Sequence, residues 1–127
     1  MSNPDDRRYS ETHEWHKLEG STVTIGITRF AVDELTDVTF VELPESGTEL
    51  KAGEPLGEIE SVKATGQIYS GINGKVVAIN DAAVEDPSLI NNDPFGDGWL
   101  VKAEIEDPSQ VDNLLDSQAY SQKFPDA

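Results

Sequence analysis

Glu60-Ser61-Val62-Lys63-Ala64-Thr65-Gly66 separates two runs of residues with strand character. A short polar segment between two strands is expected to form the exposed tip of a β-hairpin. Lys63 is one of only six lysines in the chain, and its amine at such a tip is accessible to an enzyme that acylates lysine. The alternative is an ordinary solvated lysine, because lysines and polar turns both belong on protein surfaces.

Further short strands are predicted around this segment, because apolar and polar residues alternate or β-branched residues dominate. The runs are residues 22–27, 38–43, 55–60, 75–79 and 99–105. Turn-forming residues such as Pro44, Gly47 and Asn73-Gly74 lie between them. Short strands separated by turns are typical of a sandwich or a barrel-like pair of sheets, so we expect a mainly β protein.

Helix signals are fewer and short. The expected caps and helices are Thr28 before 29–35, Asp81 before 82–85, Ser109 before a terminal helix with Val111, Leu114 and Leu115, and Ser117 before a turn that reaches Phe124. No linker is long enough to separate two domains. We therefore expect one domain over residues 1–127, with residues 1–8 as a flexible N-terminal tail.

The charge balance narrows the classes of partner. Acidic residues number 25 and basic residues 9, so the formal net charge is −16. Nucleic-acid binding needs lysines and arginines that neutralise phosphates, so we expect no nucleic-acid partner. Anionic membrane surfaces are disfavoured for the same reason, and no apolar run approaches the ~20 residues of a membrane span. The acidic surface either steers the protein to basic partners, adapts it to salt, or only solvates it.

The residue types present also limit the chemistry. Cysteine is absent, which excludes disulfides, thiolate metal sites and cysteine nucleophiles, so any thiol chemistry must come from a cofactor. No nucleophile–base pair or phosphate-binding glycine loop is visible, and His13 and His16 are expected on opposite faces of a strand, which argues against a shared metal. The first nine residues lack the apolar core of a signal peptide, so a cytoplasmic protein is expected.

The residues around Lys63 resemble a known modification site. Glu60-Ser61-Val62-Lys63-Ala64 is similar to the lipoylation site of glycine cleavage system H proteins. The similarity runs from about Tyr9 to Phe124 and includes His13-Glu14-Trp15, Phe40-Val41-Glu42-Leu43-Pro44, Lys51-Ala52-Gly53-Glu54-Pro55 and residues 89–100. This resemblance implies a hybrid barrel-sandwich, the hammerhead of lipoyl and biotinyl domains, built from two antiparallel sheets with short helices and a C-terminal helix.

The resemblance also implies a function. Proteins of this family are non-catalytic carriers that hold lipoate in amide linkage on the lysine that corresponds to Lys63. The lipoyl arm accepts an aminomethyl group from the glycine decarboxylase (P protein) and delivers it to the aminomethyltransferase (T protein). Dihydrolipoamide dehydrogenase (L protein) then reoxidises the arm, and a lipoate-attaching enzyme is a further partner.

The same resemblance assigns roles to other residues. Glu60, three residues before the lysine, and Gly74, eleven after it, are expected to be recognised by the lipoate-attaching enzyme. Gly74 is also expected to allow a tight turn, because glycine accepts a positive φ. Thr12, Glu14 and position 67 correspond to the lining of the cleft that shelters the aminomethylated arm. A carboxylate there suits a cationic amine, because charge-assisted hydrogen bonds are strong.

The sequence departs from the family pattern at two positions. Gln67 stands where aspartate is common, so protection of the loaded arm is either weaker or depends more on Glu14. Gly71 replaces a common proline, which predicts a looser turn. Three other interpretations stay open: an H-like lipoyl donor or carrier that serves other enzymes, an unmodified interaction module, and a biotinyl domain. The last is disfavoured because Val62 and Ala64 replace the methionines that usually flank a biotinylated lysine.

Overall fold

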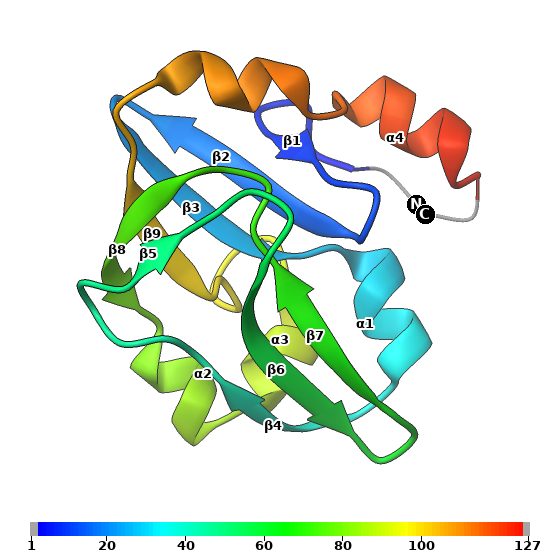
Figure 1. Ribbon diagram of the computed structural model, residues 1–127. Coiled ribbons are helices and arrows are strands. Elements are labelled where there is room, and N and C mark those ends of the chain that lie inside the picture. The colour runs from blue at the N-terminus through cyan, green and yellow to red at the C-terminus, as the bar shows by residue number, and fades with distance from the viewer. Residues whose placement is uncertain (1–2, 126–127) are drawn as a thin grey trace.

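The structure is a computed structural model that describes residues 3–125. Within these residues nine strands form two sheets, and every paired neighbour is antiparallel (Figure 1). The first sheet has the order β1 (Arg8–Tyr9), β2 (Glu14–Glu19), β3 (Thr22–Ile27), β9 (Val101–Glu104), β8 (Gly74–Ile79) and β5 (Glu49–Leu50). The second has the order β4 (Val38–Glu42), β6 (Pro55–Ser61) and β7 (Thr65–Tyr69). The expected mainly β fold with two antiparallel sheets is confirmed.

The core lies between the two sheets because side chains alternate along each strand. In the second sheet Val41, Ile59 and Ile68 are buried, whereas Glu58 and Gln67 are paired across strands and exposed on the outer face. Val23, Ile25, Val76 and Val101 of the first sheet belong to the same buried cluster. Each such side chain contributes about 1.5–3 kcal/mol when it leaves water, so this cluster holds the sheets together.

The predicted strands agree with the structure within about two residues, but β1, β2, β5 and β7 were not predicted. The strand β2 cannot be recognised from its sequence, because Glu14, Trp15 and His16 are all buried and their polar and apolar side chains do not alternate between core and solvent. Within the expected flexible tail, Arg7 stacks on Trp15 with 4.6 Å between the guanidinium carbon and the ring centre. Residues 1 and 2 of that tail lie outside the described residues, and the flexibility stays a prediction.

Short helices cover the edges of the sheets. They are α1 (Arg29–Leu35), α2 (Asp81–Glu85), α3 (Ser88–Asn92), the 3₁₀ helix η1 (Pro108–Asn113) and α4 (Ser117–Lys123). The capping role of Thr28 is confirmed, because its hydroxyl accepts the Ala31 N–H at 3.3 Å. Asp81 is the first residue of α2 rather than its cap, because Asn80 occupies the cap position.

The expected C-terminal helix from Ser109 is wrong in type and length. Asp107, not Ser109, caps a 3₁₀ helix that ends before Leu114. It stops there because Leu115 donates its N–H to the carbonyl of Tyr9, at 2.9 Å, and so forms a bridge with β1. The helix expected from Ser117 is present as α4, but Asp116 caps it.

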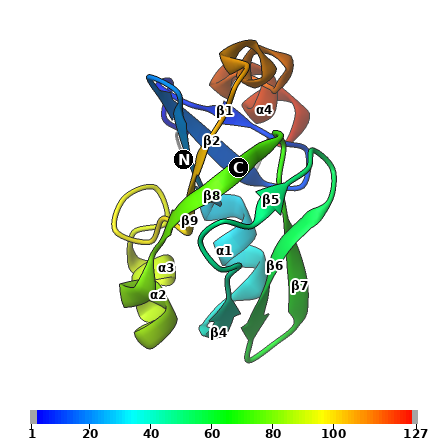
Figure 2. The ribbon, with the colours of Figure 1, turned by 60° about the vertical axis from the view of Figure 1, so that its left-hand side comes forward.

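An aromatic cluster joins the last helix to the first strands. Tyr9, Trp15 and Tyr120 are buried together, and Phe30 and Phe124 pack against them. Figures 1 and 2 show η1, drawn in orange, and α4 lying over β1 and β2 at one end of the molecule. The two ends of the described chain therefore complete one structural unit.

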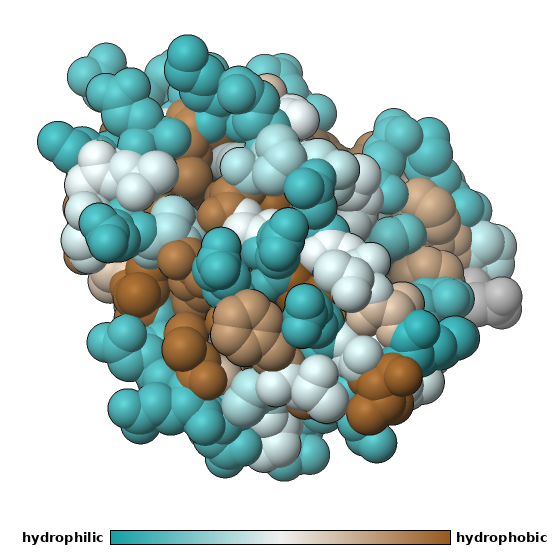
Figure 3. Space-filling view, turned by 60° about the horizontal axis from the view of Figure 1, so that its bottom comes forward, coloured by the Kyte–Doolittle hydropathy of each residue, from teal (hydrophilic) through white to brown (hydrophobic). Residues whose placement is uncertain are grey.

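The face seen in Figure 3 is mainly polar, with small apolar areas. The large apolar side chains most exposed are those of Phe40, Val62, Val77 and Val84. Among the helices formed by residues 3–125, none combines the length and the apolar character that crossing a bilayer requires.

Candidate functional site

Lys63 lies in the exposed turn of the β6–β7 hairpin. Ser61 fixes this turn: its N–H donates to the carbonyl of Ala64 at 2.8 Å, and its hydroxyl accepts the N–H groups of Lys63 and Ala64 at 3.2 and 3.0 Å. The N–H of Val62 donates to the carbonyl of Asp37 at 3.1 Å, which ties the turn to the segment before β4. The backbone is thus held in place while the amine of Lys63 remains open to solvent.

Glu60 and Gly74 lie in different sheets. Glu60 is exposed near the end of β6, opposite Phe40 and Thr65, where another protein can reach it. Gly74 begins β8, and a Cβ there would lie 2.8 Å from the carbonyl oxygen of Glu104. Its φ is not positive, so the expectation of a left-handed turn at Gly74 is wrong. Glycine is required because β9 approaches closely, and recognition of both residues by an attaching enzyme stays a prediction.

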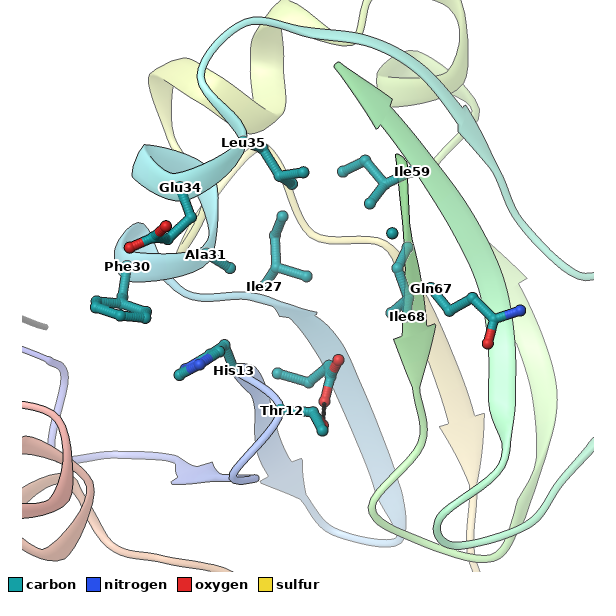
Figure 4. Close-up of a pocket in the computed structure, with 12 residues that line it drawn as sticks. Thr12, His13, Ile27, Phe30, Ala31, Glu34, Leu35, Ile59, Gln67 and Ile68 are labelled. Carbon is teal, nitrogen blue, oxygen red and sulfur yellow. Dashed lines mark hydrogen bonds between the residues drawn. The ribbon is translucent and has the colours of Figure 1, made fainter. Parts of the chain in front are cut away.

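A cleft of about 420 Å³ lies between the two sheets and α1 (Figure 4). Three segments line it: Thr12, His13 and Glu14 before and at the start of β2; Ile27 with Phe30, Ala31, Glu34 and Leu35 from β3 and α1; and Ile59, Gly66, Gln67 and Ile68 from β6 and β7. The structure therefore brings together Thr12, Glu14 and Gln67, the three residues expected near an arm. Most of the other lining side chains are apolar, so the cleft suits a ligand with an apolar body and one polar group.

Glu14 is the buried carboxyl group of this cleft. Only 1% of the residue is exposed, and its carboxylate accepts hydrogen bonds from the hydroxyl of Ser10 (2.6 Å), the hydroxyl of Thr12 and the N–H of Tyr69 (3.1 Å). Burial raises the pKa of Glu14, and the hydrogen bonds from Ser10, Thr12 and Tyr69 offset only part of that rise. A cation that enters the cleft would favour the charged form of Glu14, so this carboxyl group can bind an amine.

Gln67 contributes to the rim rather than to the polar floor. Figure 4 shows its amide turned away from Thr12 and Ile27. The hydroxyl of Tyr69 donates to the amide oxygen of Gln67 at 3.2 Å on this outer side. Sequence reasoning missed Glu34, a second carboxyl residue in the lining, which follows Phe30 by four residues and so shares its face of α1.

His13 connects the cleft to the C-terminal helix, a role that sequence reasoning also missed. It has a positive φ of 75°, and its Nδ1 is 2.7 Å from the hydroxyl of Tyr120. That hydroxyl is 2.9 Å from the hydroxyl of Thr28, and the His13 ring packs on Phe30 and Phe124. Burial lowers the pKa of His13, so the ring stays neutral near pH 7. No local signal could reveal these contacts, because His13 and Tyr120 are 107 residues apart.

A metal centre finds no support in the described part of the chain. Residues 3–125 contain no group of three or more His, Asp or Glu side chains placed to hold a metal ion. The chemistry that the site offers is therefore an exposed amine on a fixed turn, and a separate apolar cleft with a buried carboxyl group.

Comparisons with known proteins agree with this geometry. Residues 7–127 match the family model described as glycine cleavage H-protein. A probable glycine cleavage system H protein of Haloarcula marismortui is 53% identical over 117 residues, which are 92% of each chain. A glycine cleavage system H protein of Bacillus cereus is 49% identical over 122 residues, 96% of each chain. The crystal structure of such a protein from Mycobacterium marinum superposes with a TM-score of 0.86 at 39% identity, covering 95% of this chain and 98% of that one.

Proposed function

The chain belongs to the glycine cleavage H-protein family, and we propose that it carries lipoate in amide linkage on Lys63. The observation that carries the proposal is the exposed amine of Lys63 on a turn whose backbone is fixed by Ser61. The cleft supports it, because apolar side chains and one buried carboxyl group suit the apolar arm and the cationic amine of the proposed cargo. The residues present therefore fit the cofactor.

Lipoate would supply a disulfide that is reduced when it accepts the aminomethyl group and is reoxidised afterwards. The protein's own residues would do the rest. Ile27, Leu35 and Ile59 would give the arm an apolar surface, and Glu14 would supply a negative charge held by its own hydrogen bonds. The chain has no cysteine, so no protein thiol competes by exchange with the cofactor.

The proposed carrier is non-catalytic and works with four enzymes: the P protein that decarboxylates glycine, the T protein that takes the aminomethyl group, the L protein that reoxidises the arm, and a lipoate-attaching enzyme. A tethered arm raises the effective concentration of its reactive end at each partner. The net charge of −16 favours encounters with basic surfaces of these partners. A location in the cytoplasm stays a prediction.

A second candidate function keeps the lipoate and changes the partners. Gln67 carries no charge, and its amide is turned away from the cleft, so the aminomethyl amine would have fewer polar contacts there. This observation favours, as the alternative, an H-like lipoyl donor or carrier that serves other enzymes. Loading with the P protein and unloading with the T protein distinguish the two functions.

The test is the intact mass of the protein from its native host, followed by peptide mapping. We expect a mass increase of one lipoyl group, located on Lys63, and transfer of a labelled aminomethyl group from glycine to that protein by the P protein. Lys63→Arg should lose the modification. Lys75→Arg is its matched control, because Lys75 is also exposed on the surface, and this variant should keep the modification. An unmodified Lys63 in cells that lipoylate other proteins would contradict the proposal.

A further inference from the structure

Two side chains of β2 hold the end of β7 through its backbone. The carboxylate of Glu14 accepts the N–H of Tyr69, with 3.1 Å between Oε2 and N. The Nε2 of His16 accepts the N–H of Gly71, with 3.0 Å between the two nitrogens. Ser70, between them, donates its N–H in the other direction, to the carbonyl of Glu54 at 3.0 Å.

This arrangement follows from the two-residue period of strands. Glu14 and His16 are two residues apart in β2, so their side chains lie on one face. Tyr69 and Gly71 are also two residues apart, so their N–H groups leave the same edge of an extended segment. In the strand order β4-β6-β7, that edge of β7 has no strand partner among residues 3–125. The side chains of Glu14 and His16 therefore take the acceptor role that a neighbouring strand would have.

The neutral ring of His16 is placed to accept a hydrogen bond from the backbone. Its ring is fully buried, and Nδ1 has no hydrogen-bond partner among the described residues. Because Nε2 accepts a hydrogen bond from the N–H of Gly71, the neutral ring must carry its own proton on Nδ1. Burial also lowers the pKa of His16 to about 4, so the ring is neutral near pH 7. The bond from Gly71 is thus the side-chain hydrogen bond through which this ring contacts the turn after β7.

The packing around Gly71 supports the same conclusion. A Cβ at Gly71 would lie 3.0 Å from Cε1 and Nε2 of His16 and from a methyl group of Leu114. The ring thus fits directly against the backbone of the turn. The tyrosine held by Glu14 also donates its hydroxyl to Gln67, so the anchored end of β7 is continuous with the rim of the cleft.

We infer that His16 is a positioning residue of the cleft, which acts together with Glu14 to fix the free edge of β7 and so the wall formed by Gly66, Gln67 and Ile68. The consequence for an arm rests on the proposed function, whereas the anchor itself does not. With the anchor intact, the wall stays in place and water is kept from the cleft. Without it, the end of β7 moves away from β2 and the cleft opens.

Hydrogen exchange tests the anchor on the unmodified protein. His16→Leu removes the acceptor, and His16→Gln keeps one on a side chain of similar reach. We expect the amide of Gly71 to exchange about tenfold faster in His16→Leu, relative to the amide of Leu100 in the core, because one buried hydrogen bond is lost. His16→Gln should restore the ratio. Val76→Ala, a core variant in β8, should speed both amides together, and an unchanged ratio in His16→Leu would overturn the inference.

The second measurement follows the loaded arm. Lipoylated wild type, His16→Leu, His16→Gln and Val76→Ala are loaded with a labelled aminomethyl group, and its spontaneous loss is timed. We expect the labelled group to leave about tenfold faster in His16→Leu, and in this variant alone, because it lacks the hydrogen bond to Gly71. Equal rates in wild type and His16→Leu would refute the positioning role. Failure of the wild type to be loaded would refute the proposed function instead, and the exchange experiment would still decide on the anchor.

Discussion

The two ends of the β6–β7 hairpin are held in opposite ways. At the tip, the turn of Lys63 is fixed mainly by hydrogen bonds within residues 61–64. At the other end, Tyr69 and Gly71 are held by Glu14 and His16, each 55 residues away in the sequence. Local bonds suffice to present an amine for modification. The cleft needs the two sheets to be in place, so the proposed attachment of lipoate and the proposed shelter of the arm should respond differently to mutation.

The largest expected effect is the loss of lipoate attachment in a variant of the hairpin tip that keeps its stability. Lys63→Arg should abolish attachment of lipoate completely, because arginine offers no amine of the kind that is acylated. The free energy of unfolding should stay within about 0.5 kcal/mol of the wild type, because Lys63 is exposed. Mass spectrometry and urea unfolding measure the two quantities. A lipoyl group on this variant would show that attachment is directed elsewhere.

The second-largest expected effect is the pH dependence of stability that His16 causes at the buried end of the hairpin. The pKa of His16 is lowered to about 4 in the folded state, from an ordinary value of 6.5. The unfolded chain therefore binds a proton first, so stability is fully present above pH 6.5 and is lost as the pH falls toward 4. The loss from this group is on the order of 3 kcal/mol. The raised pKa of Glu14 acts in the opposite direction and favours the fold at low pH.

Urea unfolding between pH 7 and pH 4 measures this slope. The difference between wild type and His16→Gln isolates the contribution of His16, because Glu14 and His13 titrate in both proteins. Ser61→Ala at the tip serves as the control and should keep the slope of the wild type. If His16→Gln loses as much stability as the wild type on acidification, His16 does not remain neutral in the folded protein.

A smaller loss is expected from Glu14→Ala. The substitution leaves the N–H of Tyr69 and the hydroxyls of Ser10 and Thr12 without their acceptor, which should cost about 2 kcal/mol of unfolding free energy. Lipoylation of Lys63 should continue, since the turn of the tip keeps its own bonds. Thermal or urea unfolding, with mass spectrometry on the same sample, tests both. Loss of lipoylation in a folded Glu14→Ala protein would contradict the independence of the two ends.

The smallest effect is expected at the tip itself. Ser61→Ala removes the hydroxyl that accepts the N–H groups of Lys63 and Ala64, and should cost about 1 kcal/mol at most because the turn is exposed. Attachment of lipoate should slow while the loaded arm keeps its lifetime. Rates of lipoylation with the purified attaching enzyme give the first quantity. An unchanged rate would mean that the enzyme orders the turn itself.

The sequence predicted what depends on local pattern. The alternation at residues 22–27 gave β3, and Thr28 was correctly placed as the cap of α1. It did not predict β2, because Glu14 and His16 are polar residues whose burial depends in part on hydrogen bonds to Tyr69 and Gly71, each 55 residues away. Gly74 shows the same limit: the need for glycine arises from β9, which no neighbouring residue reveals. The cleft residues came from resemblance alone.

Two contacts that join distant parts of the sequence can form only after most of a growing chain has been made. They are the bridge between Tyr9 and Leu115 and the contact of His13 with Tyr120. The hairpin that carries Lys63 is complete in sequence when Tyr69 has been added, whereas the contact of His13 beside the cleft needs Tyr120 of α4, much further along the chain. Contacts between distant parts of a chain form late. A growing chain that has passed Tyr69 but has not reached Tyr120 can thus form the turn of Lys63 before the cleft is finished.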